Sequence, residues 1–135
     1  MSAEKPKPHA TPDSEPYWQA VQDGKLRLQR CSGCGHVRHY PQPVCPRCCL
    51  LETEWIEASG RGTIHSWTVA HHAFHPAFKG DLPYTLLIVD LAEGPRAMGR
   101  LDPASAGTLR LGLPVRIAFP PNDAGVRLPV FTLEG

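Results

Sequence analysis

Two short cysteine motifs constrain this chain more than any other feature of its sequence. Cys31 pairs with Cys34 and Cys45 with Cys48, each time with two residues between them, and only ten residues separate the two pairs. Two thiolates at this spacing lie on one tight turn, and two such turns that face each other supply four soft ligands in a tetrahedron. The spacing therefore predicts a four-thiolate metal site, which suits zinc.

A site of this kind is expected to stabilise the fold, because four protein ligands leave no position for water or a substrate. Iron with a rubredoxin-type electron-transfer role is the alternative, since the same four thiolates hold iron. Zinc is favoured because no redox-partner site is evident and because a second module follows the cysteines. Cys49 directly follows Cys48 and cannot easily bind the same ion beside it, so its role stays open.

Charge and cysteine content exclude several classes of protein. Fourteen Lys and Arg residues nearly balance thirteen Asp and Glu residues, which removes the broad attraction expected toward nucleic acid or acidic membranes. No apolar run reaches membrane-spanning length, and the N-terminus lacks the hydrophobic segment of a secretory signal. Five cysteines fit a reducing compartment and a metal better than disulfides. We expect a soluble, cytoplasmic protein without a membrane partner.

The first part of the chain is predicted to be a tail, a helix and a ribbon. Residues 1–12 are rich in Lys and Pro and predict a disordered tail. A short amphipathic helix follows and should end at Gly24. Polar and apolar residues alternate over 25–30, and 52–57 is a plausible return strand. Residues 13–58 are therefore predicted to form an N-terminal helix and a zinc ribbon that depends on its metal for stability.

Residues 59–135 are predicted to form a small all-β barrel. Five short strands with turn residues between them favour a closed barrel over a sandwich. The expected strands cover residues 63–70, 84–91, 96–101, 115–119 and 128–133. The connection 102–112 has room for one helical turn, as in an OB-fold. The predicted fold class is thus mostly β, with an N-terminal helix and a rubredoxin-like zinc ribbon followed by a five-stranded OB-fold barrel.

Histidines form the other visible cluster. His71, His72 and His75 lie between the first two expected barrel strands and could hold a second metal or touch a ligand. Adjacent histidines on a strand point in opposite directions, so exposed loop residues are the simpler interpretation. His36 and His39, between the cysteine pairs, are expected to face solvent.

Two further groups of residues are candidates for contacts with other molecules. The segment 59–62 contains two glycines and Arg61, so it could be an anion-binding loop, although a hinge between the two parts is simpler. Aromatic residues outside regular patterns could anchor a protein interface. These candidates are Tyr17, Trp18, Trp55, Phe74 and Phe78, whereas Trp67 is expected to pack inside or between the two parts.

The order of these parts resembles a known family. Its most specific stretches are Tyr17-Trp18, 26–34, 41–48, 59–64 with Trp67-Thr68, and 112–115. They resemble the rubredoxin-like zinc-ribbon/OB-fold proteins, formerly a domain of unknown function, that accompany thiolase-like enzymes of acyl-CoA metabolism. The resemblance covers residues 13–133. This sequence departs from the family pattern at Cys49, where relatives usually have glycine after the last ligand.

The resemblance implies a non-catalytic subunit bound to a thiolase-fold partner, such as a thiolase, an acyltransferase or a sterol side-chain aldolase. Such a subunit supports the partner and its acyl-CoA channel, and acyl-CoA is expected to be contacted only within the complex. Some relatives act in lipid or steroid degradation, in heteromeric complexes. The structural zinc ligands carried over are Cys31, Cys34, Cys45 and Cys48, and no catalytic residue is implied.

Two other functions remain open at this point. Zinc ribbons and OB-folds also bind single-stranded nucleic acid, but the near-neutral charge makes nucleic acid an unlikely partner. An enzyme acting on acyl-CoA through the histidine cluster is the other alternative. The sequence contains no nucleophile with an accompanying base, no phosphate-binding P-loop and no dinucleotide fingerprint. It therefore gives no positive argument for catalysis by this chain alone.

Overall fold

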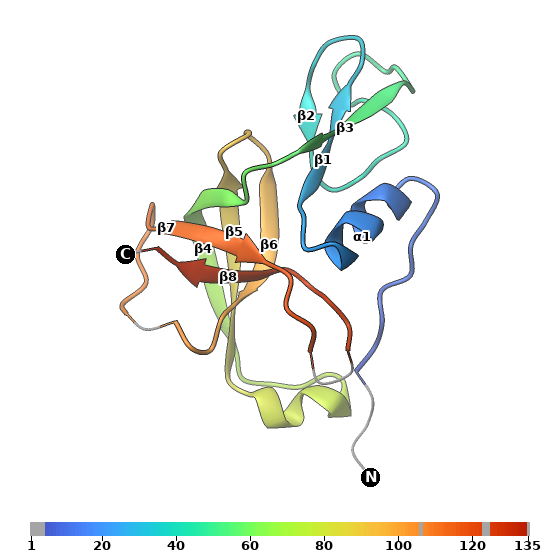
Figure 1. Cartoon of the computed structure of the whole chain (residues 1–135). Helices are drawn as coiled ribbons and strands as arrows, with labels where there is room; N and C mark the ends of the chain where they lie inside the picture. The colour runs from blue at the N-terminus through green and yellow to red at the C-terminus, as the bar shows by residue number, and fades with distance from the viewer. Residues whose placement is uncertain (1–4, 106, 123–124, 135) are drawn as a thin grey trace.

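The computed structural model describes residues 5–105, 107–122 and 125–134. They form a small three-stranded sheet that carries the cysteine loops, a closed five-stranded barrel, and an α-helix beside both (Figure 1). The fold class predicted from the sequence is confirmed. None of the helices formed by the described residues has the length and apolar character needed to cross a bilayer.

The small sheet holds the metal-binding loops and has the strand order β2-β1-β3. Its strands are β1 (Arg27–Cys31), β2 (Val37–Arg38) and β3 (Thr53–Glu57), and both pairings are antiparallel. The alternation of polar and apolar residues predicted β1, and the expected return strand over 52–57 corresponds to β3. The two residues of β2 are too few to show an alternation, so the sequence did not reveal this strand.

Helix α1 (Glu15–Gln22) packs its apolar face inward. Pro16 lies in the first turn, where its missing amide hydrogen costs no helical hydrogen bond. Gly24 has a φ of 74°, a left-handed conformation that glycine adopts at a helix end without strain. The residues that share the buried face are Tyr17, Ala20 and Val21. The burial of Tyr17 excludes it as an anchor for another protein, contrary to one of the expectations above.

The barrel closes in the order β4-β5-β6-β8-β7. Neighbouring strands are antiparallel except for the short parallel pairing of β6 with β8. All five expected strands are present, with small shifts at their ends. They are β4 (Arg61–Ala70), β5 (Tyr84–Leu91), β6 (Arg96–Leu101), β7 (Pro114–Ala118) and β8 (Val130–Leu133).

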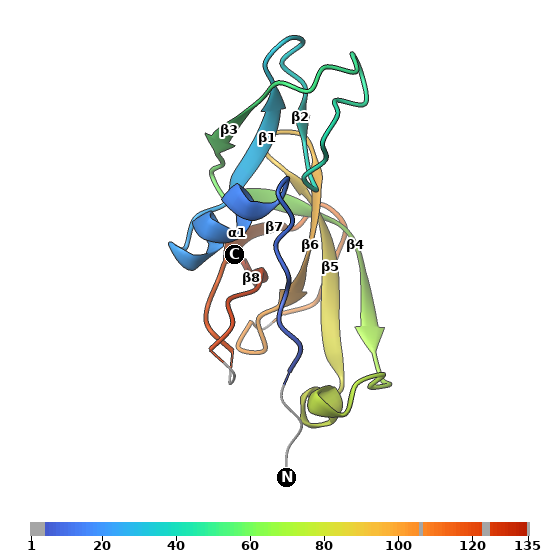
Figure 2. The same ribbon diagram turned by 90° about the vertical axis from the view of Figure 1, so that its right-hand side faces the viewer.

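Two expectations about the barrel are wrong. The expected helical turn is absent from the described part of 102–112, and a 3-10 helix, η1 (Pro76–Asp81), lies instead between β4 and β5. Trp67 is 39% exposed rather than packed inside. Beyond Thr63, β4 pairs with β5 alone, and the two strands run side by side toward η1 (Figure 2). Ile64 is still buried, whereas residues 65–70 of this extension are half-buried or exposed.

The ribbon, the helix and the barrel share one hydrophobic core. Val21 of α1 and Leu28 of β1 belong to the same cluster of buried residues as Leu87 and Phe131 of the barrel, and all four are 0% exposed. Loosening of the ribbon therefore exposes apolar surface that the barrel also uses. The division into residues 13–58 and 59–135 stays a prediction.

Two polar contacts connect distant segments at the barrel surface. The Lys5 ammonium lies 2.8 Å from the Asp81 carboxylate of η1, which brings the described part of the N-terminal segment against the barrel. Tyr40, from the loop after β2, accepts a hydrogen bond of 2.9 Å from the Met98 amide of β6 through its hydroxyl oxygen. Tyr40 thus covers a backbone group on the side of β6 that faces away from β5.

His39 is half-buried, whereas the sequence analysis expected it to face solvent. Its ring centroid lies 5.2 Å from that of Tyr17 in the core-facing helix. Burial penalises the charged imidazolium and lowers the pKa of His39 from 6.5 to about 4.

This burial predicts a loss of stability in mild acid. The unfolded chain protonates His39 near pH 6.5, whereas the folded chain does so only near pH 4. The free energy of unfolding should therefore fall by about 2 kcal/mol between pH 7 and pH 5 because of this group. Urea unfolding of the zinc-loaded chain and of His39→Gln across this range measures the difference. Exposed His72, replaced by Gln, is the control, and an equal pH dependence in all three proteins would contradict the prediction.

Candidate functional site

The four cysteines of the two motifs come together at the end of the ribbon. Their Sγ atoms all lie within 4.8 Å of one another. Cys31 and Cys48 are 3.3 Å apart and Cys34 and Cys45 are 3.6 Å apart, measured between Sγ atoms. A tetrahedron of sulfurs about 2.3 Å from a zinc ion has edges of about 3.8 Å. The donor set and its spacing therefore fit zinc.

The two cysteine turns have the same backbone design. In the first, Gly35 donates its amide to the Cys31 carbonyl, and in the second Cys49 donates to the Cys45 carbonyl, both at 3.0 Å. Backbone amides also point at the sulfurs, from Cys34 to Cys31 Sγ at 3.5 Å and from Arg47 to Cys45 Sγ at 3.4 Å. Such donors stabilise thiolates.

The four thiols lie so close together that ionisation of one opposes ionisation of its neighbours. Backbone amides, above all that of Cys34, lower the pKa of the Cys31 thiol to about 6. The Leu50 amide acts in the same direction on Cys48, but the neighbouring thiols, Cys31 first, outweigh it and raise the pKa of Cys48 to about 12. A divalent cation favours the thiolate form of all four groups, which removes this conflict.

Cys49 occupies the position in the second turn that Gly35 occupies in the first. Gly35 has a φ of 77° and Cys49 a φ of 66°. A residue with a Cβ atom is strained in this left-handed region, whereas glycine is not. The Cys49 thiol is exposed and does not belong to the cluster of four.

We expect Cys49→Gly to stabilise the zinc-loaded chain by about 0.5–1 kcal/mol, because it relieves this strain. Cys49→Ala is the matched control, since it removes the thiol but keeps the Cβ atom. Chemical denaturation with zinc in excess measures both variants. Equal stabilisation by Ala and Gly would assign the effect to the thiol rather than to the backbone, and loss of zinc from either variant would contradict the four-cysteine site.

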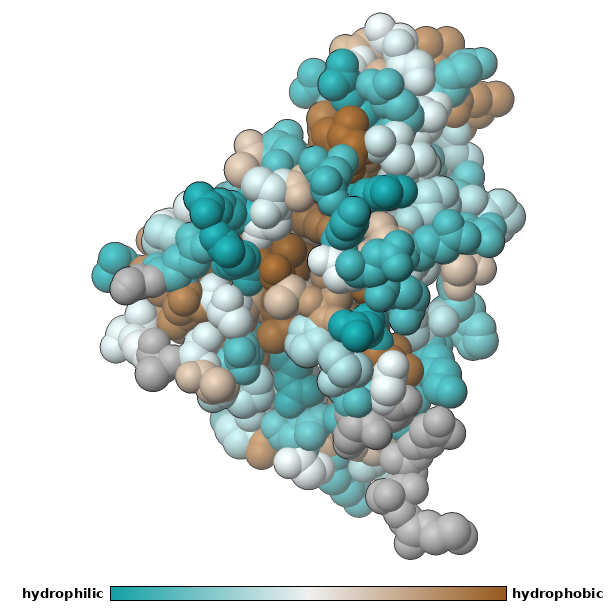
Figure 3. All heavy atoms as spheres, in the orientation of Figure 1, coloured by the Kyte–Doolittle hydropathy of each residue, from teal (hydrophilic) through white to brown (hydrophobic). Residues whose placement is uncertain are grey.

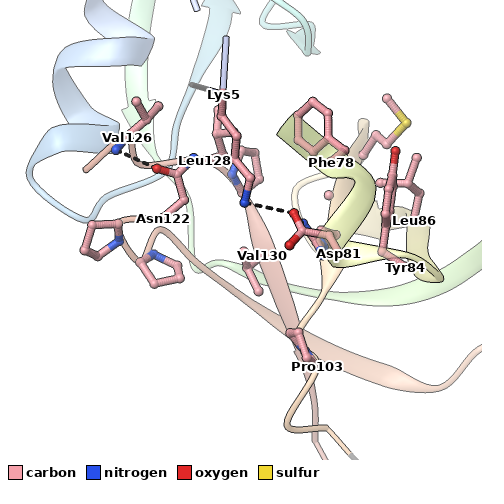
Figure 4. A pocket seen from close by; sticks show the side chains of 16 residues that line it. Lys5, Phe78, Asp81, Tyr84, Leu86, Pro103, Asn122, Val126, Leu128 and Val130 are labelled. Atoms are coloured by element: carbon pink, nitrogen blue, oxygen red, sulfur yellow. Dashed lines mark hydrogen bonds and ion pairs between the residues drawn. The ribbon is translucent and has the colours of Figure 1, made fainter. Parts of the chain in front are cut away.

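A mainly apolar pocket opens at the side of the barrel, between the start of β5, β6, β8, η1 and the loop before β8 (Figure 4). Its volume is about 660 Å³, which is within the range of small-molecule sites. The apolar side chains that line it include Phe78, Leu86, Met98, Val126, Leu128 and Val130. No sequence motif indicated this pocket, because its walls come from segments that are distant along the chain.

One carboxylate and two cations lie at the edge of this pocket. Asp81 binds the Lys5 ammonium at 2.8 Å (Figure 4). It also binds the Arg100 guanidinium at 3.2 Å, so both positive groups share Asp81. Hydrogen bonds from Lys5 and then from Arg100 hold the pKa of Asp81 below its ordinary value. The Arg100 guanidinium also lies 4.7 Å from the centre of the Tyr84 ring. An apolar pocket with a cationic rim results.

The structure separates the other candidate residues from these sites, except Phe78. His71 and His72 are exposed and His75 half-buried, and none of the three lines the apolar pocket. His75 accepts a hydrogen bond from the Ala77 amide through Nδ1 and caps η1. Phe74 is 95% exposed, and Phe78 lines the pocket. Trp18 and Trp55 are half-buried and pack against the shared core.

The second half of the segment 59–62 belongs to a strand, so it forms neither an anion-binding loop nor a hinge. Arg61 and Gly62 both belong to β4: Arg61 pairs with β7, and Gly62 pairs with both β5 and β7. A Cβ atom at Gly62 would lie 2.5 Å from the Asp90 carbonyl oxygen. Glycine is therefore required at this position by the close approach of two strands.

A four-thiol ribbon joined to a closed five-stranded barrel defines the class of zinc-ribbon/OB-fold proteins. Comparison with known proteins gives the family: residues 18–49 match the ChsH2 rubredoxin-like zinc ribbon domain, and residues 55–120 match the ChsH2 C-terminal OB-fold domain. The chain belongs to this family, also known as DUF35, as its resemblance to the zinc-ribbon/OB-fold proteins predicted. The match to the ribbon domain and the clustered thiols confirm the expected zinc ribbon.

Three relatives illustrate the range of the family. The chain is 36% identical over 127 residues to the probable enoyl-CoA hydratase alpha subunit of Thermomonospora curvata. It is 33% identical over 114 residues to the 3-oxo-4,17-pregnadiene-20-carboxyl-CoA hydratase alpha subunit of Mycobacterium tuberculosis. It is 32% identical over 91 residues to a DUF35 domain-containing scaffold protein of Methanocaldococcus jannaschii. The matches cover 94%, 84% and 67% of this chain, respectively.

The chain spans only part of the two hydratase subunits, 39% and 35% of their lengths, and 64% of the scaffold protein. Among solved structures, a chain of the Ltp2-ChsH2(DUF35) aldolase superposes with a TM-score of 0.82 at 35% identity. That superposition covers 94% of this chain and 98% of the other. A DUF35 protein from Sulfolobus solfataricus, at 14% identity and a TM-score of 0.64, shares the fold.

Proposed function

We propose that this chain is a non-catalytic accessory subunit of an acyl-CoA enzyme, with a thiolase-fold protein as its partner. The observation that carries the proposal is the likeness to a chain of the Ltp2-ChsH2(DUF35) aldolase, which extends over nearly the full length of both chains. Two relatives named as subunits of acyl-CoA hydratases support the same class of assembly. The cytoplasm is the compartment proposed for it.

Zinc has a structural role in this proposal. Cys31, Cys34, Cys45 and Cys48 would hold it, and their mutual spacing supports this assignment. Zinc supplies no chemistry to a reaction here, because four thiolates complete its coordination. Its contribution is to fix the two cysteine turns relative to the strands that carry them, which a ribbon of this size cannot do through its own core.

The ribbon and α1 would dock on the partner, and the barrel would lie near the acyl-CoA entrance. Large apolar side chains stay exposed at the cysteine loops. They are Val44, Leu50 and Leu51, which are 38%, 42% and 67% exposed. Figure 3 shows hydrophobic residues at the tip of the ribbon. Exposed apolar groups gathered in one place favour a protein contact, and the apolar pocket of the barrel suits an acyl group.

Affinity purification from extracts of the source cells tests the proposal. The tagged, zinc-loaded chain should retain a thiolase-fold protein, and Leu51→Asp should reduce its recovery by about tenfold or more, as expected for a charge buried in an interface. Leu111→Asp is the matched control, because Leu111 is 68% exposed and lies in the barrel connection. The proposal fails if the unaltered chain recovers no thiolase-fold protein. Equal losses in both variants would remove the ribbon tip as the contact.

A further inference from the structure

A second, polar pocket lies where the ribbon meets the barrel. It is formed by the ribbon segment 35–47, which includes β2, and by residues 93–96 at the turn from β5 into β6, and its volume is about 680 Å³. Its charged and titratable lining residues are His36, Arg38, His39, Arg47, Glu93 and Arg96. None of these residues was a candidate for a site on sequence grounds, because neither segment contains a phosphate-binding motif.

Positive charge exceeds negative charge in this polar pocket. Three arginines face one carboxylate, that of Glu93, whose Oε2 accepts a hydrogen bond of 2.9 Å from the Ser59 amide. Arg96 binds Asp90 at 2.8 Å. Arg47 is exposed and makes no ion pair with any residue that the structure describes. The arrangement attracts an anion.

Arg38 gives the strongest indication of what the pocket takes. Its side chain starts from β2, and the residue is only 4% exposed. Nη2 donates to the Gln42 carbonyl at 3.1 Å and to Thr53 Oγ1 at 2.7 Å. Nε and Nη1 are buried without a hydrogen-bond partner, and no carboxylate forms an ion pair with Arg38 within the described ranges. A buried guanidinium in this state is costly unless an anion compensates it.

Strand β6 connects this polar pocket with the apolar pocket. Arg96, Met98 and Arg100 alternate along β6 with buried residues, so they share its outer face. Arg96 lines the polar pocket, whereas Met98 and Arg100 line the apolar one. Four residues of strand correspond to about 13 Å. An elongated molecule with an anionic end and an apolar end can therefore follow this strand.

We propose that the polar pocket binds a phosphate or diphosphate group of a small-molecule ligand, held by Arg38, Arg47 and Arg96. Guanidinium groups match phosphate oxygens with paired hydrogen bonds, and a carboxylate offers fewer acceptors to three arginines. The volume is sufficient for a nucleotide-sized group. The identity of the ligand as an acyl-CoA rests on the proposed function, whereas the phosphate site itself does not.

Calorimetric titration of the zinc-loaded full chain with pyrophosphate and with coenzyme A tests this site, with acetate as the reference anion at matched ionic strength. Saturable binding of both phosphate compounds is expected, without saturable binding of acetate. Arg47→Ala/Arg96→Ala should weaken binding by about tenfold or more, because it removes two charge-assisted contacts. Arg27→Ala/Arg110→Ala lowers the net charge equally at exposed positions outside the pocket and should bind as the unaltered chain does.

The outcomes separate the possible sources of the phosphate group. Equal affinities for pyrophosphate and coenzyme A support a site for the phosphate group alone, and tighter binding of coenzyme A supports a nucleotide ligand. Absence of saturation, or equal weakening in both double variants, would overturn the proposal. If Arg47→Ala/Arg96→Ala instead abolishes recovery of the protein partner without any phosphate binding, the pocket is a partner contact. That result would overturn the phosphate site and leave the accessory-subunit proposal standing.

Discussion

Replacement of Cys45 by serine is expected to abolish zinc binding and unfold the ribbon. Cys45 is fully buried, and its sulfur belongs to the cluster of four. Structural zinc contributes about 10–16 kcal/mol in small zinc domains, as much as or more than the whole stability of an ordinary domain. Because the ribbon shares its core with the barrel, we expect the barrel to lose stability as well. Zinc content by elemental analysis and circular dichroism on heating measure both effects.

Cys49→Ser is the control for this experiment, since it also exchanges a thiol for a hydroxyl but lies outside the cluster. It should retain zinc and unfold as the unaltered chain does. A chelator should reproduce the effect of Cys45→Ser and release the partner, while the partner loses no metal of its own. A chelated chain that keeps both its fold and its partner would show that zinc is dispensable for the ribbon.

Gly62→Ala is expected to destabilise the barrel strongly. The new Cβ atom would lie 2.5 Å from the Asp90 carbonyl oxygen and 2.6 Å from Val89 Cγ1. Backbone cannot move aside here without breaking the pairing of β4 with β5, so we expect a loss of about 3 kcal/mol or more. Urea unfolding with zinc in excess gives the value.

Gly80→Ala provides the comparison, because a Cβ atom at Gly80 meets nothing within 4 Å and its φ lies outside the left-handed region. Its stability should change by less than about 0.5 kcal/mol. If Gly62→Ala loses as little stability as Gly80→Ala, the barrel tolerates alanine at position 62 by shifting β5. The zinc content of both proteins should stay unchanged, which separates this effect from loss of the metal.

Local patterns carried most of the fold prediction. The two cysteine pairs and the alternation along 115–119 depend only on residues close in sequence, and the structure has a cluster of four cysteines and β7 at these places. The resemblance to the family added the order of the parts. Residues whose environment depends on distant contacts were less predictable. His39 is half-buried because α1 places Tyr17 beside it, and nothing near His39 in the sequence indicates this.

The two pockets illustrate the same limit more strongly. Arg38 is an ordinary residue of a two-residue strand, and its lack of an ion pair with the described carboxylates becomes evident only when β2, β3 and the loop between the cysteine pairs are in place. Arg100 likewise acquires its role when Lys5 and Asp81 meet beside it. Spatial coincidences of this kind leave no periodic signal in the sequence.

The hydrogen bond between Tyr40 and Met98 links the metal to the tendency of the chain to self-associate. Met98 lies on a stretch of β6 that pairs with β5 on one side, and Tyr40 covers its amide on the other. Tyr40 belongs to the loop between the two cysteine pairs, so its position depends on the zinc-bound ribbon. When zinc leaves, this strand edge becomes available for pairing with another chain, as bare β-edges are in aggregation. The metal-free protein should therefore precipitate at concentrations at which the zinc-loaded protein stays dispersed.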